Sequence, residues 1–193
     1  MLGILLFLIS SGNKPLLAMM STDGKPLSPS FVIRQEKSRS QGVLVSRPNE
    51  LDQKIRDFII HQELYTIEQY AQWVKKDILY QKDSPLDTWS SPLETLRKKT
   101  GDCEDYALLH SAVLRVMGYH PHFIAVNQPK GAHAICFFEY NGFFFWFDNN
   151  RLLKSTEKNL EKFLTLLTSR YHSPYLLEFN FEDSNWQVLF KRS

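Results

Sequence analysis

The stretch TGDCEDYA, residues 100–107, constrains the fold more than any other part of the sequence. The apolar pattern that follows it predicts a helix over about residues 102–117, with Gly118 placed to end it. Cys103 then lies in the first helical turn, where unpaired backbone N–H groups and the helix dipole lower the pKa of a thiol. Cys103 is therefore a candidate nucleophile.

Acidic residues surround this cysteine, namely Asp102, Glu104 and Asp105. Nearby carboxylates disfavour a thiolate, so their charge needs a partner. Backbone N–H groups of the first turn can satisfy them, and so can the basic run at residues 97–99. Carboxylates together with carbonyls can also bind a hard cation such as calcium. Capping and ion pairs are the favoured interpretation, and calcium is the alternative.

Capping patterns predict three helices before this stretch. Asn49 is expected as the N-cap of the first, and Thr66 and Gln69 have the form of a capping box for the second. Ser91 precedes a proline at the first position of the third. Each predicted helix carries apolar residues at helical spacing on one face.

Strand patterns dominate the chain after the helix of Cys103. Asn141-Gly142 is a strong hairpin signal between two apolar runs. Strands are expected at residues 119–126, 133–140, 143–147, 175–181 and 186–190, with one helix at about residues 156–169. Helices first and an antiparallel sheet afterwards predict an α+β domain in which the helix of Cys103 packs on the sheet.

The hairpin register brings a histidine and an aspartate to the same face. If residues 141–142 form a two-residue turn, counting outward makes His133 and Asp148 diagonal neighbours. An imidazole and a carboxylate can meet across such a diagonal, so Asp148 is expected to orient His133 as a general base. The same count places Cys136 opposite Phe147 on the other face, where we expect a small buried hydrophobe.

Composition excludes several classes of protein. A net charge of +2, from 23 basic and 21 acidic residues, shows no footprint of nucleic-acid binding. Two cysteines exclude a disulfide scaffold. The apolar run at residues 2–9 is too short to span a bilayer, so no stable membrane insertion is expected.

The N-terminal part leaves the location of the protein open. Residues 2–9 have the character of a signal-peptide core, but no Lys or Arg precedes them, so periplasmic, secreted and cytoplasmic locations all stay open. After residue 20 the composition turns to Ser, Pro, Lys and Arg. We expect a signal-like segment and a loosely ordered lead-in at residues 1–48, followed by one domain over residues 49–193.

Two segments resemble a known family. The run WSSPLETL at residues 89–96 and the later TGDCEDYA are similar to the core of the transglutaminase-like superfamily, with His133 and Asp148 in the expected order. Over about residues 80–150 the chain is most similar to the bacterial transglutaminase-like cysteine peptidases. The resemblance implies a papain-like core with Cys103 as nucleophile, His133 as general base and acid, and Asp148 as orienting acid.

The resemblance also implies roles for residues around this triad. Trp89 would lie near the oxyanion site. In some relatives acidic residues beside the cysteine bind calcium, which makes Asp102, Glu104 and Asp105 candidate ligands. No cofactor is expected to be required, and calcium is the one candidate.

Three functions remain open for such a site. A cysteine peptidase would hydrolyse an amide of a protein or peptide substrate, a transglutaminase would pass the acyl group to an amine, and an inactive relative would bind a peptide. The joint placement of Cys103, His133 and Asp148 favours catalysis over a structural role. The resemblance favours the peptidase.

Overall fold

The structure is a computed structural model that describes residues 49–82, 88–128, 131–181 and 184–192. These residues belong to the unit that begins at Pro48. The expected signal-like segment and lead-in at residues 1–48 lie outside the described residues. The domain boundary at residue 49 therefore stays a prediction.

Each of the first three helices begins directly after the capping residue that the sequence predicts. The side chains of Asn49 and Ser91 each accept a hydrogen bond from the first turn, and Thr66 with Gln69 forms a complete capping box. These helices are α1 (Glu50–His61), α2 (Ile67–Asp77) and α3 (Pro92–Lys98).

A short parallel pairing fixes the start of α4 (Cys103–Val116). β1 (Leu79–Tyr80) pairs with β2 (Thr100–Gly101), directly before that helix. A Cβ at Gly101 would lie 2.7 Å from Cβ of Asp105, so glycine allows this close approach. The sequence does not reveal the pairing, because strands of two residues show no periodic pattern.

A six-stranded sheet follows α4, with strand order β6-β5-β4-β3-β7-β8. All neighbouring strands are antiparallel, and the β4–β5 hairpin has the predicted register, with Cys136 opposite Phe147. The strands are β3 (His122–Gln128), β4 (Gly131–Tyr140), β5 (Phe143–Asp148), β6 (Arg151–Lys154), β7 (Tyr175–Asn180) and β8 (Asn185–Lys191).

Three of these elements differ most from the sequence prediction. β3 begins at His122 rather than at residue 119, because Pro121 has no N–H to donate to a strand ladder. The last helix, α5 (Leu160–Arg170), begins after the cap residue Asn159 rather than at residue 156. β6 is not predicted, since its four residues are too few to show an alternation.

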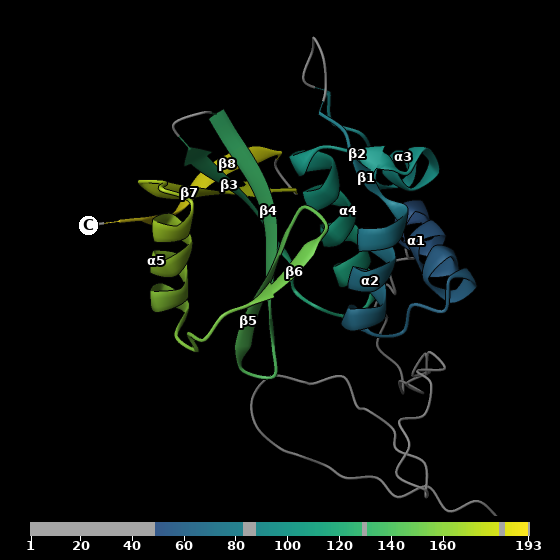
Figure 1. Cartoon of the computed structure of the whole chain (residues 1–193), viewed down its shortest axis with the longest axis horizontal. Helices are drawn as coiled ribbons and strands as arrows, with labels where there is room; N and C mark the ends of the chain where they lie inside the picture. Colours follow the sequence, from purple (N-terminus) through teal and green to yellow (C-terminus); the bar gives the residue numbers. More distant parts are fainter. Residues whose placement is uncertain (1–48, 83–87, 129–130, 182–183, 193) are drawn as a thin grey trace, which may run out of the picture. The chain divides into compact units, whose positions relative to one another are not determined.

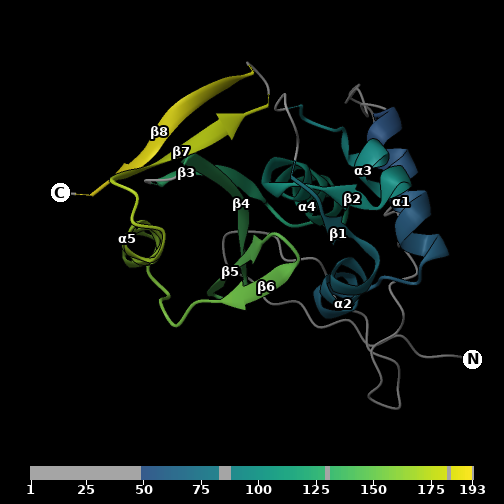
Figure 2. The same cartoon turned by 45° about the horizontal axis from the view of Figure 1, so that its top comes forward.

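Helices cover both faces of the sheet, and each face has its own core. Figure 1 shows α4 on one side of β4 and α5 on the other. The core under α4 includes Leu109, Phe138 and Phe147, whereas the core under α5 includes Trp146 and Phe163. In Figure 2, α1 and α3 lie beyond α4, away from the sheet. The fold is thus α+β, with the N-terminal helices and the helix of Cys103 packed on an antiparallel sheet, as predicted.

Within the described residues, no helix combines the length and the apolar character that crossing a membrane requires.

Candidate active site

Cys103 lies in the first turn of α4, at the edge of the buried core. Its S–H donates a hydrogen bond to Oε2 of Glu104 at 3.1 Å, and its sulfur accepts one from the backbone N–H of Ala134 on β4. Burial raises the pKa of the thiol to about 12, and Glu104 and Asp102 act in the same direction, against the bond from Ala134. The thiol is therefore protonated in this arrangement.

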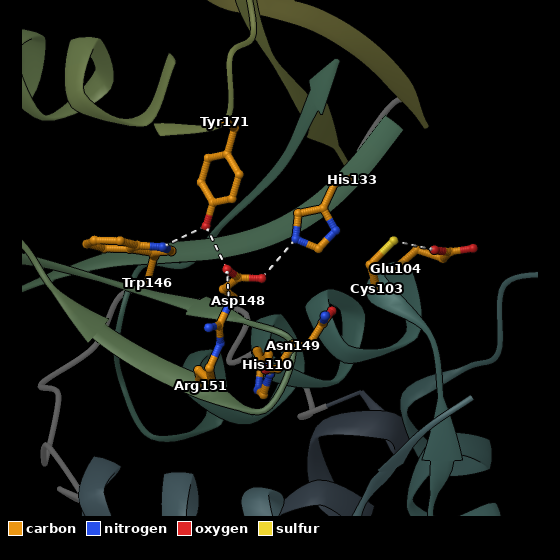
Figure 3. A network of polar contacts seen from close by, with 9 residues as sticks. All are labelled: Cys103, Glu104, His110, His133, Trp146, Asp148, Asn149, Arg151 and Tyr171. Atoms are coloured by element: carbon orange, nitrogen blue, oxygen red, sulfur yellow. Dashed lines mark hydrogen bonds and ion pairs between the residues drawn. The ribbon is translucent and has the colours of Figure 1, made fainter. Parts of the chain in front are cut away.

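His133 on β4 and Asp148 at the end of β5 are in direct contact. Nε2 of His133 lies 2.9 Å from Oδ1 of Asp148. Figure 3 shows the imidazole between Asp148 and Cys103, with the ring edge that carries Nδ1 turned toward the side of Cys103. The side chains of His133 and Asp148 are only 16% and 8% exposed, so solvent screens their contact weakly.

The second carboxylate oxygen of Asp148 is also occupied. Oδ2 accepts hydrogen bonds from the guanidinium of Arg151 at 2.8 Å and from the hydroxyl of Tyr171 at 3.1 Å. Trp146 in turn donates its indole N–H to the Tyr171 hydroxyl at 3.0 Å. Burial raises the pKa of Asp148, but the bond and charge of His133, the charge of Arg151 and the bond from Tyr171 outweigh it, so the pKa is lowered. Asp148 is an anion held by donors on both oxygens.

His110 connects α4 to the turn that follows Asp148. The sequence alone indicates no partner for this histidine, whereas the structure gives it two. Its Nε2 bonds the backbone oxygen of Asn149 at 2.8 Å, which requires Nε2 to carry the proton, so Nδ1 accepts from the hydroxyl of Tyr70 at 2.8 Å. Burial lowers the pKa of His110 to about 3, against the effect of the Asn149 bond. The ring is therefore neutral and stacks on Phe147.

The acidic residues around Cys103 follow the favoured interpretation only in part: the carboxylate of Asp105 accepts from the backbone N–H of Asp102, as first-turn capping expects. Asp102 is the N-cap residue of α4, but its side chain makes no capping bond. Oδ1 of Asp105 also accepts from the N–H of Ser90 at 2.6 Å. In the described part of the chain, Oδ1 of Asp102 is buried without a hydrogen-bond partner.

The basic run at residues 97–99 is engaged elsewhere. Arg97 and Lys98 pair with Glu94, and Lys99 pairs with Asp77. The expected ion pairs with the acidic residues at Cys103 are therefore replaced by pairs within α3 and between Lys99 and the end of α2. The ligand atoms of Asp102, Cys103 and Glu104 lie within 4.8 Å of one another, a spacing compatible with one shared cation. Asp105 is not part of this group.

Two aromatic residues flank the start of α4. Trp89 is 46% exposed and packs edge-on against Phe123 and Phe179. Tyr80 on β1 is 51% exposed. Burial raises the pKa of Tyr80, and the charges of Asp102 and Glu104 add to this effect, so its phenol lies in the field of the acidic residues beside Cys103. Sequence analysis singles out Trp89 but not Tyr80.

A family model described as a transglutaminase-like domain matches residues 51–170, from α1 to the end of α5. The chain belongs to the transglutaminase-like family. No curated protein sequence matches this transglutaminase-like chain.

Solved structures with a similar chain path include LapG of Legionella pneumophila in a calcium-bound form. It is 18% identical, with 74% of this transglutaminase-like chain and 77% of that chain covered and a TM-score of 0.46. EGTA-treated LapG is 20% identical, with 74% of each chain covered and a TM-score of 0.44. A proposed cysteine protease from Cytophaga hutchinsonii is 15% identical, with 73% of this chain and 50% of that chain covered and a TM-score of 0.44.

Sequence analysis of this transglutaminase-like chain predicts His133 as a partner of Asp148 but misses Arg151, Tyr171 and the bond from His110 to Asn149. Tyr171 lies just past the residues that the family model matches and is brought in by the end of α5. Arg151 follows Asp148 by three residues, a spacing that a tight turn between β5 and β6 could have suggested. His110 interrupts an apolar helix, which is a local signal of a buried polar contact.

Proposed function

We propose that this transglutaminase-like chain is a cysteine peptidase that hydrolyses an amide bond of a protein or peptide substrate. Cys103 is the proposed nucleophile, His133 the general base and acid, and Asp148 the residue that orients the imidazole. The observation that carries the proposal is the 2.9 Å contact between Nε2 of His133 and Asp148, with Nδ1 turned toward the side of Cys103.

The proposed reaction has two halves. The thiol proton of Cys103 passes to Nδ1 of His133, and the sulfur adds to the amide carbonyl carbon. The C–N bond then breaks, and the imidazolium gives its proton to the departing amine, which leaves a thioester. In the second half His133 takes a proton from water, and the hydroxide oxygen adds to the thioester carbonyl. The C–S bond then breaks, and the imidazolium returns its proton to the departing sulfur, which releases a carboxylic acid and restores the thiol.

Two donors are proposed for the negative oxygen that forms in both halves. The backbone N–H of Cys103 lies in the first helical turn, where N–H groups have no partner within the helix. The indole N–H of Trp89 is the second proposed donor. Donors fixed before the reaction stabilise a developing oxyanion more than mobile water does.

Calcium is proposed as an activator that binds beside the thiol. The buried, unpartnered Oδ1 of Asp102 in the described residues and the nearby carboxylate of Glu104 fit a hard cation. Asp105 is a weaker candidate because Ser90 already occupies its Oδ1. A bound cation would supply positive charge that offsets the carboxylates acting against a Cys103 thiolate.

Alkylation tests the nucleophile and its base. We expect iodoacetamide at neutral pH to label wild-type protein but not Cys103→Ala, since Cys136 is fully buried. His133→Ala should slow the labelling at least tenfold, whereas the control His122→Ala should not, because His122 contacts Glu178 instead. The proposal would be refuted if His133→Ala left the rate of iodoacetamide labelling unchanged both in the presence of calcium and in the presence of a chelator.

A second experiment separates hydrolysis from acyl transfer. The protein is incubated with a glutamine peptide and a primary amine, and products are read by mass spectrometry. Incorporation of the amine would assign the chain as a transglutaminase and overturn the peptidase proposal.

Thermal unfolding, measured alongside activity, tests the calcium site. We expect added calcium to raise the Tm of wild-type protein but not that of Asp102→Asn. A calcium-induced change in Tm that is equal in the two proteins would remove the proposed site.

A further inference from the structure

The sheet face that α4 covers continues past Cys103 onto the last hairpin. Ala134, whose N–H bonds the sulfur of Cys103, pairs with Ala125, which pairs with Leu177, which pairs with Val188. Residues that are paired across antiparallel strands point to the same face. A row of small and aliphatic side chains therefore leads from the thiol across β4, β3, β7 and β8.

A second row, made of aromatic rings, runs beside the first. Phe123 on β3 lies 6.0 Å from Phe179 on β7, and Phe179 lies 5.1 Å from Trp186 on β8, between ring centroids. Trp89, from the segment before α3, closes this row at 5.8 Å from Phe179 and 6.2 Å from Trp186. The two rows form a continuous apolar surface with no charged side chain among their members.

Much of this surface is open to solvent. Val188 is 64% exposed and Trp186 38% exposed, and Ala125, Leu177 and Phe179 are half-buried. We call these five residues the apolar strip. An exposed, contiguous apolar surface on a soluble domain commonly marks a binding site.

The apolar strip is tied to the start of α4. The N–H of Ser90 bonds Asp105 in the first turn of α4, which fixes the neighbouring Trp89 beside both the helix start and the strip. Successive strands are about 4.8 Å apart, so Leu177 lies about 10 Å from Ala134, a span of about three extended residues. The strip thus begins one strand away from Ala134, whose N–H bonds the thiol, and lies within reach of the same peptide.

The hairpin that completes the strip follows the residues that the family model matches. The family match ends at residue 170, whereas β7 and β8 cover Tyr175–Asn180 and Asn185–Lys191. Segments beside the reactive groups of a scaffold commonly carry binding specificity.

We propose that the apolar strip is the substrate subsite that receives an aromatic or large aliphatic side chain about three residues from the bond that Cys103 attacks. The proposal rests on the proposed function, because it takes Cys103 as the reacting group. A peptide with a charged or small side chain at that position is then a poor substrate.

Two alkylating reagents that share the same iodoacetyl-glycine amide part test the subsite. Iodoacetyl-glycine phenethylamide carries an aromatic ring, and iodoacetyl-glycine hydroxyethylamide carries a polar end. On wild-type protein we expect the aromatic reagent to label Cys103 about tenfold faster, because burial of a ring is worth about that factor. Val188→Lys, at an exposed strip position, should bring the ratio of the two rates close to one.

Gln187→Lys is the matched control, since it adds the same charge to the opposite face of β8 at an exposed position and should keep the ratio. A ratio near one on wild-type protein, or equal ratios in both variants, overturns the subsite. So does a concentration-dependent dimer in wild-type protein that Val188→Lys abolishes, which would make the strip an interface between copies.

The two proposals fail in different measurements. The ratio of the labelling rates of the two reagents compares reactions of the same thiol, Cys103. It therefore tests the strip even if that thiol reacts slowly. Dependence of plain iodoacetamide labelling on His133 tests the proposed function alone.

Discussion

Asp148 accepts hydrogen bonds from side chains that come from three parts of the chain: His133 on β4, Arg151 on β6 and Tyr171 after α5. A carboxylate held on both oxygens cannot rotate freely. The imidazole that it contacts is thereby kept in one orientation, with Nδ1 on the side of Cys103. The geometry at the proposed base depends on residues that never touch the sulfur.

Removing the charge of Asp148 should change how stability depends on pH. Its pKa is lowered in the folded state, so its contribution is present above the unfolded pKa of about 4 and is lost as pH falls through the folded pKa. We expect the free energy of unfolding of Asp148→Asn, measured in urea, to decline less below pH ~4 than that of wild-type protein. Asp57→Asn, on the exposed surface of α1, controls for the loss of any one carboxylate. Identical declines in Asp148→Asn and wild-type protein would contradict the assigned shift.

Tyr171→Phe should destabilise the protein by about 1–3 kcal/mol, because the buried indole N–H of Trp146 loses its acceptor and Asp148 loses a donor. Urea unfolding monitored by fluorescence measures the change. Tyr175→Phe is the control, since the Tyr175 hydroxyl makes a bond of 3.3 Å at an exposed site. An effect of Tyr171→Phe no larger than that of Tyr175→Phe would show that this network adds little to stability.

At the scale of elements, α4 positions two different parts of the candidate site. Cys103 and His110 lie seven residues, or about two turns, apart on this helix. His110 bonds the backbone of Asn149, directly after Asp148, while Cys103 accepts a bond from β4. One helix therefore helps to fix the position of the sulfur relative to the carboxylate of Asp148.

His110 should make the protein sensitive to mild acid. Its pKa is about 3 in the folded state and about 6.5 when unfolded, so below pH ~6.5 the unfolded chain takes up a proton that the folded chain does not. Because of this one group, the free energy of unfolding then falls by about 1.4 kcal/mol for each pH unit by which the pH is lowered. His110→Gln removes the titrating group, and its unfolding free energy should fall less between pH ~7 and ~5. Equal slopes in the two proteins would rule out a neutral buried His110.

Local patterns predict those elements whose cause is local. The caps at Asn49, Thr66 and Ser91 and the register of the β4–β5 hairpin follow from neighbouring residues, and the structure confirms them. The contact between His133 and Asp148 follows from that register. The partners of His110 and the position of Tyr171 depend on packing between distant elements, which leaves no periodic signal in the sequence.

At the scale of the whole unit, one sheet separates two cores and is shared by both. β4 sends Phe138 into the core under α4 and Phe137 into the core under α5. The order of the strands, with β3 beside β7, could not be read from the sequence because it joins segments about fifty residues apart. A substitution that destabilises one core should therefore also destabilise the other, because both cores pack on the same strands.

Phe163→Ala tests this coupling. Phe163 is fully buried under α5 and stacks on Phe144, so its truncation should cost about 3–5 kcal/mol. We expect unfolding to remain a single transition, with tryptophan fluorescence and far-UV circular dichroism giving the same midpoint. Leu160→Ala, at a site 48% exposed on the same helix, should change little. Two separated transitions would show that the cores unfold independently.

The hydrogen bond from Cys103 to Glu104 has a consequence for survival of the sulfur. Hydrogen peroxide attacks thiolates, and the products beyond sulfenic acid are not reversed by ordinary thiols. A proton that a neighbouring carboxylate holds on the sulfur keeps Cys103 in its least oxidisable form. The acidic residues that disfavour the thiolate would then also slow its oxidation. We expect peroxide to oxidise Cys103 in the resting protein more slowly than it oxidises free cysteine.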